Sequence, residues 1–477
     1  MNGKPSKWSV VSGGCLLIAM VAMATPATAD TDGDLKSRLE RAEARLAELE
    51  TKQSQSWLEG QRVEEVKMLV REVLADADTR ASLLEGSSAG HNGQNFFLSN
   101  DDGSFLMMIG GIVQVRHIWN LRDQGENSTI DQNERGFEIG RAKVGFWGHI
   151  ADPRIKYSLR ISADREDNEA LFDEVLLSYD LMDGMTIWGG ETKAPFLREE
   201  LTAAAHQLTV ERSLVNEVFT MGTVQGIGMD WWIDKGSSNM VRLRASINDG
   251  IRSGEPDFRT DADLHSEDGD SNDKIFDDDN TDFAVTARAD VRIMGDWGQG
   301  DDFTAWSGEE MSLLIGGALH WEVAETGDTS GNNEFLTWTV DGSIESNGAN
   351  GYGAVVASHD LENEVLSNAT HWGFVAQGGY QVVPDKIEPF ARYEYLYVKT
   401  LGADEDKDLH LLTFGVNWYL NTHNAKFTTD IVWALDSIPS ANSLGIDSDN
   451  LSLLGLLPDD SGQEDQIVWR AQFQLLF

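Results

Sequence analysis

The chain has 477 residues and a formal net charge of −43 at pH 7, with 41% hydrophobic residues and a negative mean hydropathy. So acidic a chain is a poor partner for nucleic acid, because the phosphates of nucleic acid are also negatively charged. No apolar run beyond residue 29 approaches the roughly 20 residues that a membrane helix needs. Helical membrane spans and nucleic-acid partners are therefore excluded.

The first 29 residues have the layout of a secretory signal peptide. Lys4 and Lys7 form a short basic region, residues 10–24 are largely apolar, and Ala27-Thr28-Ala29 matches a small-residue cleavage site. The only cysteine is Cys15, which leaves a lipoprotein as an alternative, although the preceding Ser12-Gly13-Gly14 lack the usual aliphatic residue and most of the apolar run follows Cys15. If cleavage follows Ala29, the exported chain has no thiol for a disulfide, a metal site or a nucleophile.

Residues 30–85 are predicted to be helical. Leu35, Leu39, Ala42, Leu46 and Leu49 are spaced by four and three residues, and a second set between residues 63 and 77 repeats this spacing. The pattern predicts a short periplasmic coiled coil that could contact the cell wall, or alternatively an amphipathic helix packed on another surface. Residues 86–104, rich in glycine, serine, histidine and asparagine at their start, are predicted to be a linker.

The last strand alternates strictly between apolar and polar residues. Ile467, Trp469, Phe473 and Phe477 fall on one face, whereas residues 466, 470, 472 and 474 are polar and fall on the other. An uncovered apolar strand at a chain end would promote aggregation in a soluble protein. The pattern is similar to the C-terminal strand of bacterial outer-membrane barrels, and it predicts an all-β transmembrane barrel that begins near residue 105.

Residues 105–477 contain about sixteen strand patterns, which predicts a 16-stranded antiparallel barrel. Short connections alternate with long ones, as expected if short turns face the periplasm and long loops face outward. The longer connections are residues 122–134, 193–224, 250–282 and 437–465. The predicted strands are residues 105–121, 135–150, 155–164, 171–181, 185–192, 225–234, 240–249, 283–293, 310–323, 334–342, 351–359, 371–383, 387–399, 408–420, 425–436 and 466–477.

The alternation also predicts which side chains face lipid and which face the lumen. Apolar residues such as Leu243, Val291 and Phe414 are expected to face lipid. Most tyrosines and tryptophans share that face, which favours an aromatic girdle over a sugar-binding track. Twelve basic residues fall in the inward register: Arg116, Arg141, Lys143, Lys156, Arg160, Arg242, Arg244, Arg288, Arg292, Arg392, Lys426 and Arg470. Seven acidic residues oppose them, namely Asp164, Glu174, Asp180, Asp230, Asp290, Glu394 and Asp430, so the lumen is predicted to be net basic.

Acidic residues are concentrated instead in residues 257–282, which hold eleven of them and are expected to form an outer loop. Asp268 and Asp270 alternate as in calcium loops, but Asp273 occupies the position where the turn requires glycine. A solvated loop, or one bridged by divalent ions to neighbouring lipopolysaccharide, is therefore the preferred interpretation.

Two segments resemble the phosphate-selective porin O and P family. Gly189-Gly190-Glu191-Thr192-Lys193-Ala194-Pro195-Phe196, followed by Glu199-Glu200-Leu201-Thr202 and Glu211-Arg212-Ser213, resembles the fifth strand and third loop of that family. Gly140-Arg141-Ala142-Lys143-Val144-Gly145 is similar to its early strands. The resemblance implies a trimeric porin whose third loop folds inward, with basic residues along the path of an anion. It also implies that the loop residues Lys193, Arg198 and Arg212 lie near the constriction.

The sequence thus predicts an outer-membrane porin for small, phosphate-like anions, with no cofactor, no metal ion and no catalytic residues. Two alternatives stay open: a general or cation-selective porin governed by the acidic loops, and a structural tether to the cell wall through the coiled coil. The expected partners are the permeant anion, outer-membrane lipid and two further copies of the chain. The candidate lumen residues are Arg116, Arg141, Lys143, Lys156, Arg160, Lys193, Arg198, Arg212, Arg242, Arg244 and Arg288.

Overall fold

The protein was analysed as a computed structural model. It describes residues 87–93, 95–122, 133–163, 170–233, 240–250, 281–326, 331–362, 370–399, 407–444, 446, 448–458 and 466–477. The predicted signal peptide and coiled coil, nearly all of the acidic segment 257–282, and Asp164 lie outside these residues. Among the described residues, no helix is both long and apolar enough to cross a membrane.

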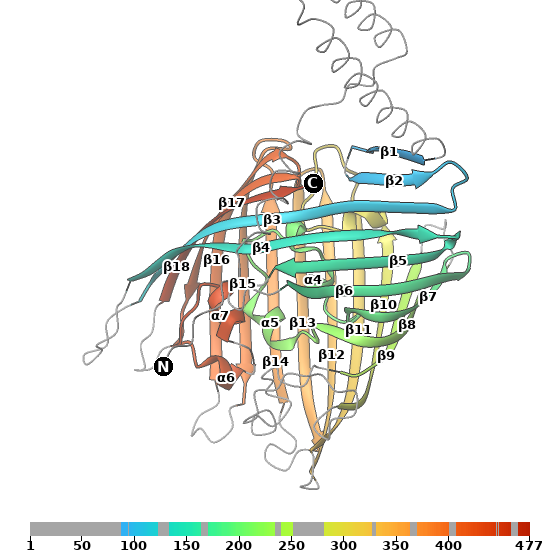
Figure 1. Cartoon of the computed structure of the whole chain (residues 1–477). Helices are drawn as coiled ribbons and strands as arrows, with labels where there is room; N and C mark the ends of the chain where they lie inside the picture. The colour runs from blue at the N-terminus through green and yellow to red at the C-terminus, as the bar shows by residue number, and fades with distance from the viewer. Residues whose placement is uncertain are drawn as a thin grey trace, which may run out of the picture. The chain divides into compact units, whose positions relative to one another are not determined.

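Sixteen antiparallel strands, β3 to β18, form a closed barrel, as the sequence predicts (Figure 1). Each strand pairs with its neighbours in the chain, and β18 pairs with β3 to close the ring. The strands are β3 (Phe105–Leu121), β4 (Asn133–Ile150), β5 (Asp152–Ala163), β6 (Ala170–Met182), β7 (Met185–Lys193), β8 (Thr223–Ile233), β9 (Val241–Asn248), β10 (Thr281–Met294), β11 (Ser312–Thr326), β12 (Gly331–Ser346), β13 (Ala349–Glu362), β14 (Thr370–Tyr380), β15 (Ile387–Val398), β16 (Lys407–Asn421), β17 (Ala425–Ala434) and β18 (Gln466–Leu476).

The end of the chain completes the closure. The backbone of Phe477 exchanges two hydrogen bonds with that of Gly111, with N to O distances of 2.8 and 3.1 Å. A Cβ atom on Gly111 would lie 2.5 Å from the Phe477 ring, so glycine is needed at this position. The terminal aromatic residue that identified the last strand is therefore seated on the first barrel strand.

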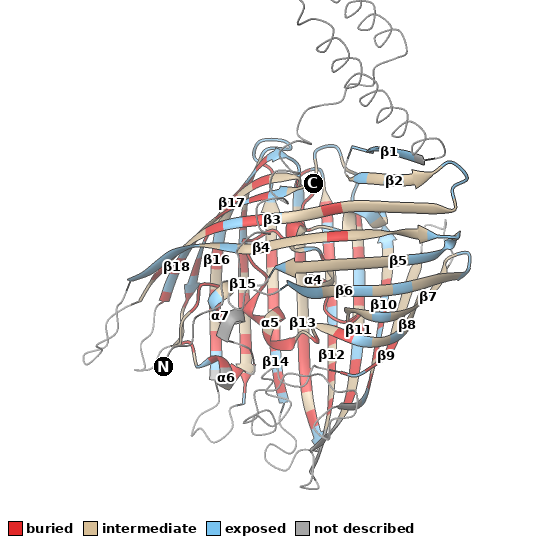
Figure 2. Cartoon of the chain, viewed as in Figure 1, coloured by how far each residue is buried: buried red, intermediate tan, exposed pale blue. Residues whose placement is uncertain are grey.

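The predicted facing of the side chains is confirmed along β18. Ile467, Trp469 and Phe473 are exposed on the outer surface, whereas Arg470 and Gln474 are buried in the interior. Figure 2 shows the same contrast around the barrel, with buried positions alternating along many strands. This apolar exterior is what a barrel needs in lipid.

Most turns at the end that carries the C-terminus are short. β4 and β5 are joined by Ala151, and β16 and β17 by residues 422–424. Ala151, Asn347, Asp385 and Thr422 adopt positive φ angles in four such turns. Because short turns face the periplasm in outer-membrane barrels, we assign this end to the periplasmic side. The connection 295–311 breaks the predicted alternation, because it lies at the same end, is long and contains the 3₁₀ helix η3 (Trp297–Gly300).

The segment predicted as a linker contains two further strands, β1 (Ser87–His91) and β2 (Phe96–Asn100). These strands pair with each other, and β2 pairs with the first part of β3, from Leu106 to Ile109. That part of β3 extends past the end of β18, so β2 supplies the hydrogen bonds that β18 does not reach. The linker prediction missed this hairpin because the start of the segment is polar and rich in glycine, without the alternation typical of a strand.

Candidate functional site

The connection between β7 and β8, residues 194–222, folds into the barrel and is called loop 3 below. It contains α4 (Arg198–Leu201), η1 (Ala204–His206) and α5 (Leu214–Phe219). Its apolar side chains pack against the inward faces of β11 to β17, and Phe196, Leu208 and Phe219 are at most 1% exposed. On β14, Gly373 leaves room for α5, since a Cβ atom there would lie 2.6 Å from Val215. Burial of this apolar face fixes loop 3 to one side of the lumen.

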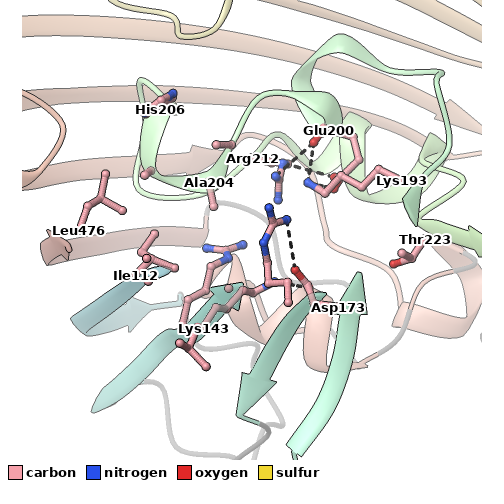
Figure 3. A pocket seen from close by; sticks show the side chains of 18 of the residues that line it. Ile112, Lys143, Asp173, Lys193, Glu200, Ala204, His206, Arg212, Thr223 and Leu476 are labelled. Atoms are coloured by element: carbon pink, nitrogen blue, oxygen red, sulfur yellow. Dashed lines mark hydrogen bonds and ion pairs between the residues drawn. The ribbon is translucent and has the colours of Figure 1, made fainter. Parts of the chain in front are cut away.

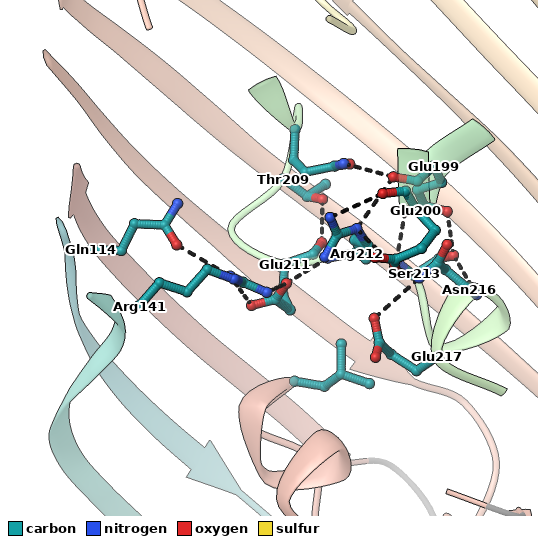
Figure 4. Close-up of polar contacts among 12 residues, drawn as sticks. Gln114, Arg141, Glu199, Glu200, Thr209, Glu211, Arg212, Ser213, Asn216 and Glu217 are labelled. Atoms are coloured by element: carbon teal, nitrogen blue, oxygen red, sulfur yellow. Dashed lines mark hydrogen bonds and ion pairs between the residues drawn. The ribbon is translucent and has the colours of Figure 1, made fainter. Parts of the chain in front are cut away.

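Polar groups hold the backbone of the same loop, as Figure 4 shows in part. The Glu199 carboxylate accepts hydrogen bonds from the N–H and the hydroxyl of Ser213, at 2.7 and 2.6 Å. Arg392 on β15 donates to Thr209 Oγ1 at 2.7 Å and to the carbonyl of Glu211 at 2.9 Å. Glu394 accepts from the N–H of Leu214 at 2.6 Å. Loop 3 is thus tied to the wall by buried hydrogen bonds, and its position is a fixed feature of the fold.

A cavity of about 610 Å³ lies between loop 3 and the opposite wall, which β3 to β7 form (Figure 3). Its basic lining residues are Arg141, Lys143, Arg160, Lys193 and Arg212. Its acidic lining residues are Asp173, Glu200, Glu211 and Glu217. The cavity volume is within the usual range for small-molecule sites.

Ion pairs link the two sets of charges. Arg141 donates two hydrogen bonds to Glu211, at 2.7 and 2.6 Å, and Lys143 pairs with Asp173. Arg160 lies 3.7 Å from Asp173 and 3.8 Å from Glu174, too far for a hydrogen bond. On loop 3, Glu200 pairs with Lys193 at 2.7 Å and with Arg212 at 3.3 Å.

In most of these pairs the cation is the more exposed partner. The Arg160 side chain is 43% exposed, against 20% for Asp173 and 17% for Glu174. Lys193 is 28% exposed and its partner Glu200 is 13% exposed. Arg141 is likewise more exposed than Glu211, whereas Arg212 is less exposed than Glu200. The basic side chains of these pairs are therefore mostly more exposed than their acidic partners, although the lining holds nearly as many acidic as basic groups.

The loop carboxylates differ in their protonation. Burial raises the pKa of Glu211, but the charge and hydrogen bonds of Arg141 overcome this effect and hold the pKa well below its usual range. Burial likewise opposes ionisation of Glu200, and Arg212 and Lys193 keep its pKa low. Burial and the neighbouring Glu200 charge raise the pKa of Glu217. Glu217 is therefore the loop carboxylate here whose charge changes most readily near neutral pH.

Two β-bulges account for the arrangement on the strand wall. The pairing of β3 with β4 shifts at Gly140, and that of β5 with β6 shifts at Asp173. A bulge redirects the side chains beside it. As a result Glu138 reaches Arg116 at 3.1 Å and Asp173 reaches Lys143, although simple alternation would turn both acids outward. At Gly140 itself, a Cβ atom would lie 2.9 Å from the Arg116 guanidinium carbon.

The structure brings five of the eleven predicted site residues, Arg141, Lys143, Arg160, Lys193 and Arg212, to the cavity and places the other six elsewhere. Arg116 is buried behind Arg141 and shares Glu211 with it at 3.0 Å. Lys156 pairs with Asp180 near the turn between β6 and β7. Arg198, in α4 of loop 3, is buried and donates to Ser343 of β12 at 2.7 Å.

The last three residues, Arg242, Arg244 and Arg288, pair with Asp230, Asp290 and Asp341 on β8, β10 and β12. Arg288 also donates to the carbonyl of Phe196 at 2.7 Å and so fastens loop 3.

The prediction of a net basic lumen was wrong for the described residues. Sequence reasoning missed the acids that the bulges turn inward and the buried acids on β11, β12, β13 and β15. Those inward acids are Glu138, Asp173, Glu322, Asp341, Glu345, Asp360 and Glu388, in addition to the loop carboxylates. Within the cavity, the basic side chains are therefore mostly more exposed than their acidic partners. Across the described part of the interior, basic residues do not outnumber acidic ones.

Two other segments narrow the lumen. Residues 441–456, with α6 (Ala441–Leu444) and α7 (Ser448–Leu453), add Leu451, Leu454 and Leu456 to the apolar core. At the periplasmic end, the connection 295–311 meets the η1 part of loop 3. There His423 Nε2 lies 2.8 Å from Asp302, and the rings of His206 and His423 are 4.6 Å apart. Among the described residues, no group of three or more histidines, cysteines and carboxylates is arranged to hold a metal ion.

Comparison with known proteins supports this architecture. Residues 115–284 match the model of the family described as phosphate-selective porin O and P. The predicted resemblance to this family is confirmed. The matched residues include the Gly140–Gly145 motif, both bulges and all of loop 3. The chain is thus a porin-type barrel of the bacterial outer membrane.

Solved structures similar to this porin share little sequence with it. An anion-selective porin from Comamonas acidovorans has 10% identity and a TM-score of 0.49, with 78% of this chain and 99% of that chain covered. The outer-membrane channel DcaP of Acinetobacter baumannii has 10% identity and a TM-score of 0.49, with coverage of 77% and 97%. OmpF of Salmonella typhi, in a complex with daunomycin, has 13% identity and a TM-score of 0.46, with coverage of 81% and 100%. No curated protein matches the sequence.

Proposed function

We propose that this outer-membrane porin passes small anions, including oxyanions such as phosphate, through the cavity between loop 3 and the wall formed by β3 to β7. The observation that carries the proposal is the unequal exposure of the ion pairs that line the cavity. Arg160, Lys193 and Arg141 present more of their surface than do the carboxylates that pair with them. Guanidinium and ammonium groups can replace part of the hydration shell of an oxyanion.

The ion pairs also suit the release of the anion. A cation without a partner would bind an oxyanion tightly, whereas a cation already shared with a carboxylate offers a weaker site. Conduction requires sites strong enough to admit an ion and weak enough to let it leave. Lys143, Arg160 and Lys193, each beside an acid, meet both requirements.

The same lining favours a channel over an enzyme. The described residues around the cavity include His206, Thr220 and Thr223, but no serine or cysteine. The remaining charged side chains there are mostly ion-paired, which suits them to contact a passing solute. A homotrimeric assembly is a further prediction, which a molecular-mass measurement in detergent would test.

The reversal potential of the purified porin in a planar bilayer under a potassium chloride gradient tests the proposal. We expect a potential of the sign that marks chloride as the more permeant ion, and a current that phosphate blocks. The variants Arg160→Gln and Lys143→Gln should shift the potential toward that of potassium and weaken the phosphate block. The exposed pair Arg154 and Asp152 lies at a periplasmic turn, so Arg154→Gln serves as the matched control. A potassium preference in the unmodified porin would refute the proposal.

A further inference from the structure

Part of the cavity wall is apolar. Ile112 of β3, Trp147 of β4 and Leu476 of β18 line it, together with Ala203 to Ala205 of loop 3 and Leu453 of α7. Ile112, Trp147 and Leu476 are only half-buried, so they present apolar surface to the cavity. In Figure 3, Ile112, Ala204 and Leu476 lie together on one side, and Lys193 and Glu200 lie on the other. Lys143 lies beside Ile112, its partner in the pairing of β3 with β4, so the apolar groups of the cavity have one cation next to them and Lys193 across from them.

Such an apolar surface does not strengthen the binding of an inorganic anion. Chloride and phosphate keep their water when they lie beside aliphatic or aromatic carbon, so Ile112 and Leu476 add nothing to their binding. An organic anion can instead direct its acid group toward Arg160 and Lys193 and lay its carbon body against the apolar side. Each methylene withdrawn from water then strengthens binding about fourfold.

We propose that the cavity prefers organic anions that combine one acid group with an apolar body about the size of a benzene ring. This inference rests on the proposed anion selectivity and narrows it to a class of solute. A cavity of about 610 Å³ has room for such a molecule together with some water. A dianion would fit less well, because Glu217 and Glu200 stand close to the basic groups and repel a second negative charge.

The inference is tested by block of potassium chloride current in the full-length porin, with benzoate, acetate and phosphate as probes at the same pH and ionic strength. Benzoate should block at a concentration at least about fivefold lower than acetate, because its ring is withdrawn from water. The variant Ile112→Thr should reduce this ratio about threefold. Val113→Thr is the matched control, since Val113 is the next residue of β3 and is exposed on the outer surface.

Leu453→Thr gives a second variant on a loop helix, in case the strand variant does not insert. Equal block by benzoate and acetate in the unmodified porin would overturn the inference. A benzoate preference that Ile112→Thr and Leu453→Thr both leave unchanged would also overturn it, because binding would then lie elsewhere. The chloride reversal potential on the same channels judges the proposed function separately, so failure of either idea can be told from failure of the other.

Discussion

The two walls of the barrel interior are built from similar residues but have different properties. On the wall formed by β10 to β17, Arg288 and Asp341 are at most 1% exposed in their side chains. On the wall formed by β3 to β7, Arg160 is 43% exposed and Asp173 is 20% exposed. Loop 3 covers the first wall and leaves the second open. In the proposed function, the path of a solute is therefore set by where loop 3 packs, and not by where basic residues fall along the strands.

The largest effect should come from releasing loop 3 from the covered wall. Leu214 and Phe219 of α5 are at most 1% exposed, and replacing a buried residue of this size costs about 3 to 5 kcal/mol. The double variant Leu214→Ser, Phe219→Ser should undock α5, increase single-channel conductance several-fold and weaken anion selectivity. Thr220→Ser, at the end of the same helix, should leave conductance unchanged. An unchanged conductance in the double variant would mean that loop 3 does not set the pore size.

A second prediction compares charged residues on the two walls. Arg288→Gln removes the cation paired with the buried Asp341, whereas Asp290 keeps Arg244, and breaking a buried pair in this way costs about 3 to 5 kcal/mol. Arg160→Gln removes a partly exposed, loosely paired cation and should cost less than about 1 kcal/mol. Urea unfolding in detergent micelles measures both variants. Equal losses of stability would contradict the distinction between the two walls.

A third prediction uses the close contact between Gly373 and α5. In Gly373→Ala, the new Cβ atom would lie 2.6 Å from Val215 and 3.1 Å from Phe219, so the helix must move away from β14 and toward the cavity. Single-channel conductance should fall by a measurable fraction. Gly353→Ala on β13 is the control, because the nearest atom to its Cβ is 3.6 Å away.

The smallest predicted effect is a dependence of selectivity on pH. Because the pKa of Glu217 is raised, its carboxylate takes up a proton as the pH falls from alkaline values toward its ordinary pKa, and the cavity becomes more positive. Any stability linked to this group is lost as the pH rises through the raised pKa. Chloride preference should therefore increase modestly as the pH falls, and the variant Glu217→Gln should remove most of this change.

His206 also lines the cavity, but burial and His423 lower its pKa, so it takes up a proton at more acidic pH. A pH dependence that persists unchanged in Glu217→Gln would assign the titration to another group.

The strands could be predicted from the sequence because alternation of apolar and polar residues is a local signal. Each of the sixteen predicted strands overlaps a barrel strand. The pairing of charges could not be predicted, because the bulges at Gly140 and Asp173 each reverse the facing of a neighbouring residue. The docking of loop 3 depends on contacts such as that of Val215 with Gly373, which are far apart in the chain. No local pattern signals such a contact.

The central claim is that solute passes along the open wall and not along the covered one. Cys15 is the only cysteine and belongs to the predicted signal peptide, so single cysteines can be introduced without interference. Ala203 is exposed and lines the cavity, whereas Ser358 on β13, in the wall that loop 3 covers, is fully buried. A negatively charged methanethiosulfonate reagent, added during current recording, should reduce the current through Ala203→Cys and leave that through Ser358→Cys unchanged. A reduced current through Ser358→Cys with no effect on Ala203→Cys would place the pathway on the wall that loop 3 covers and contradict the account.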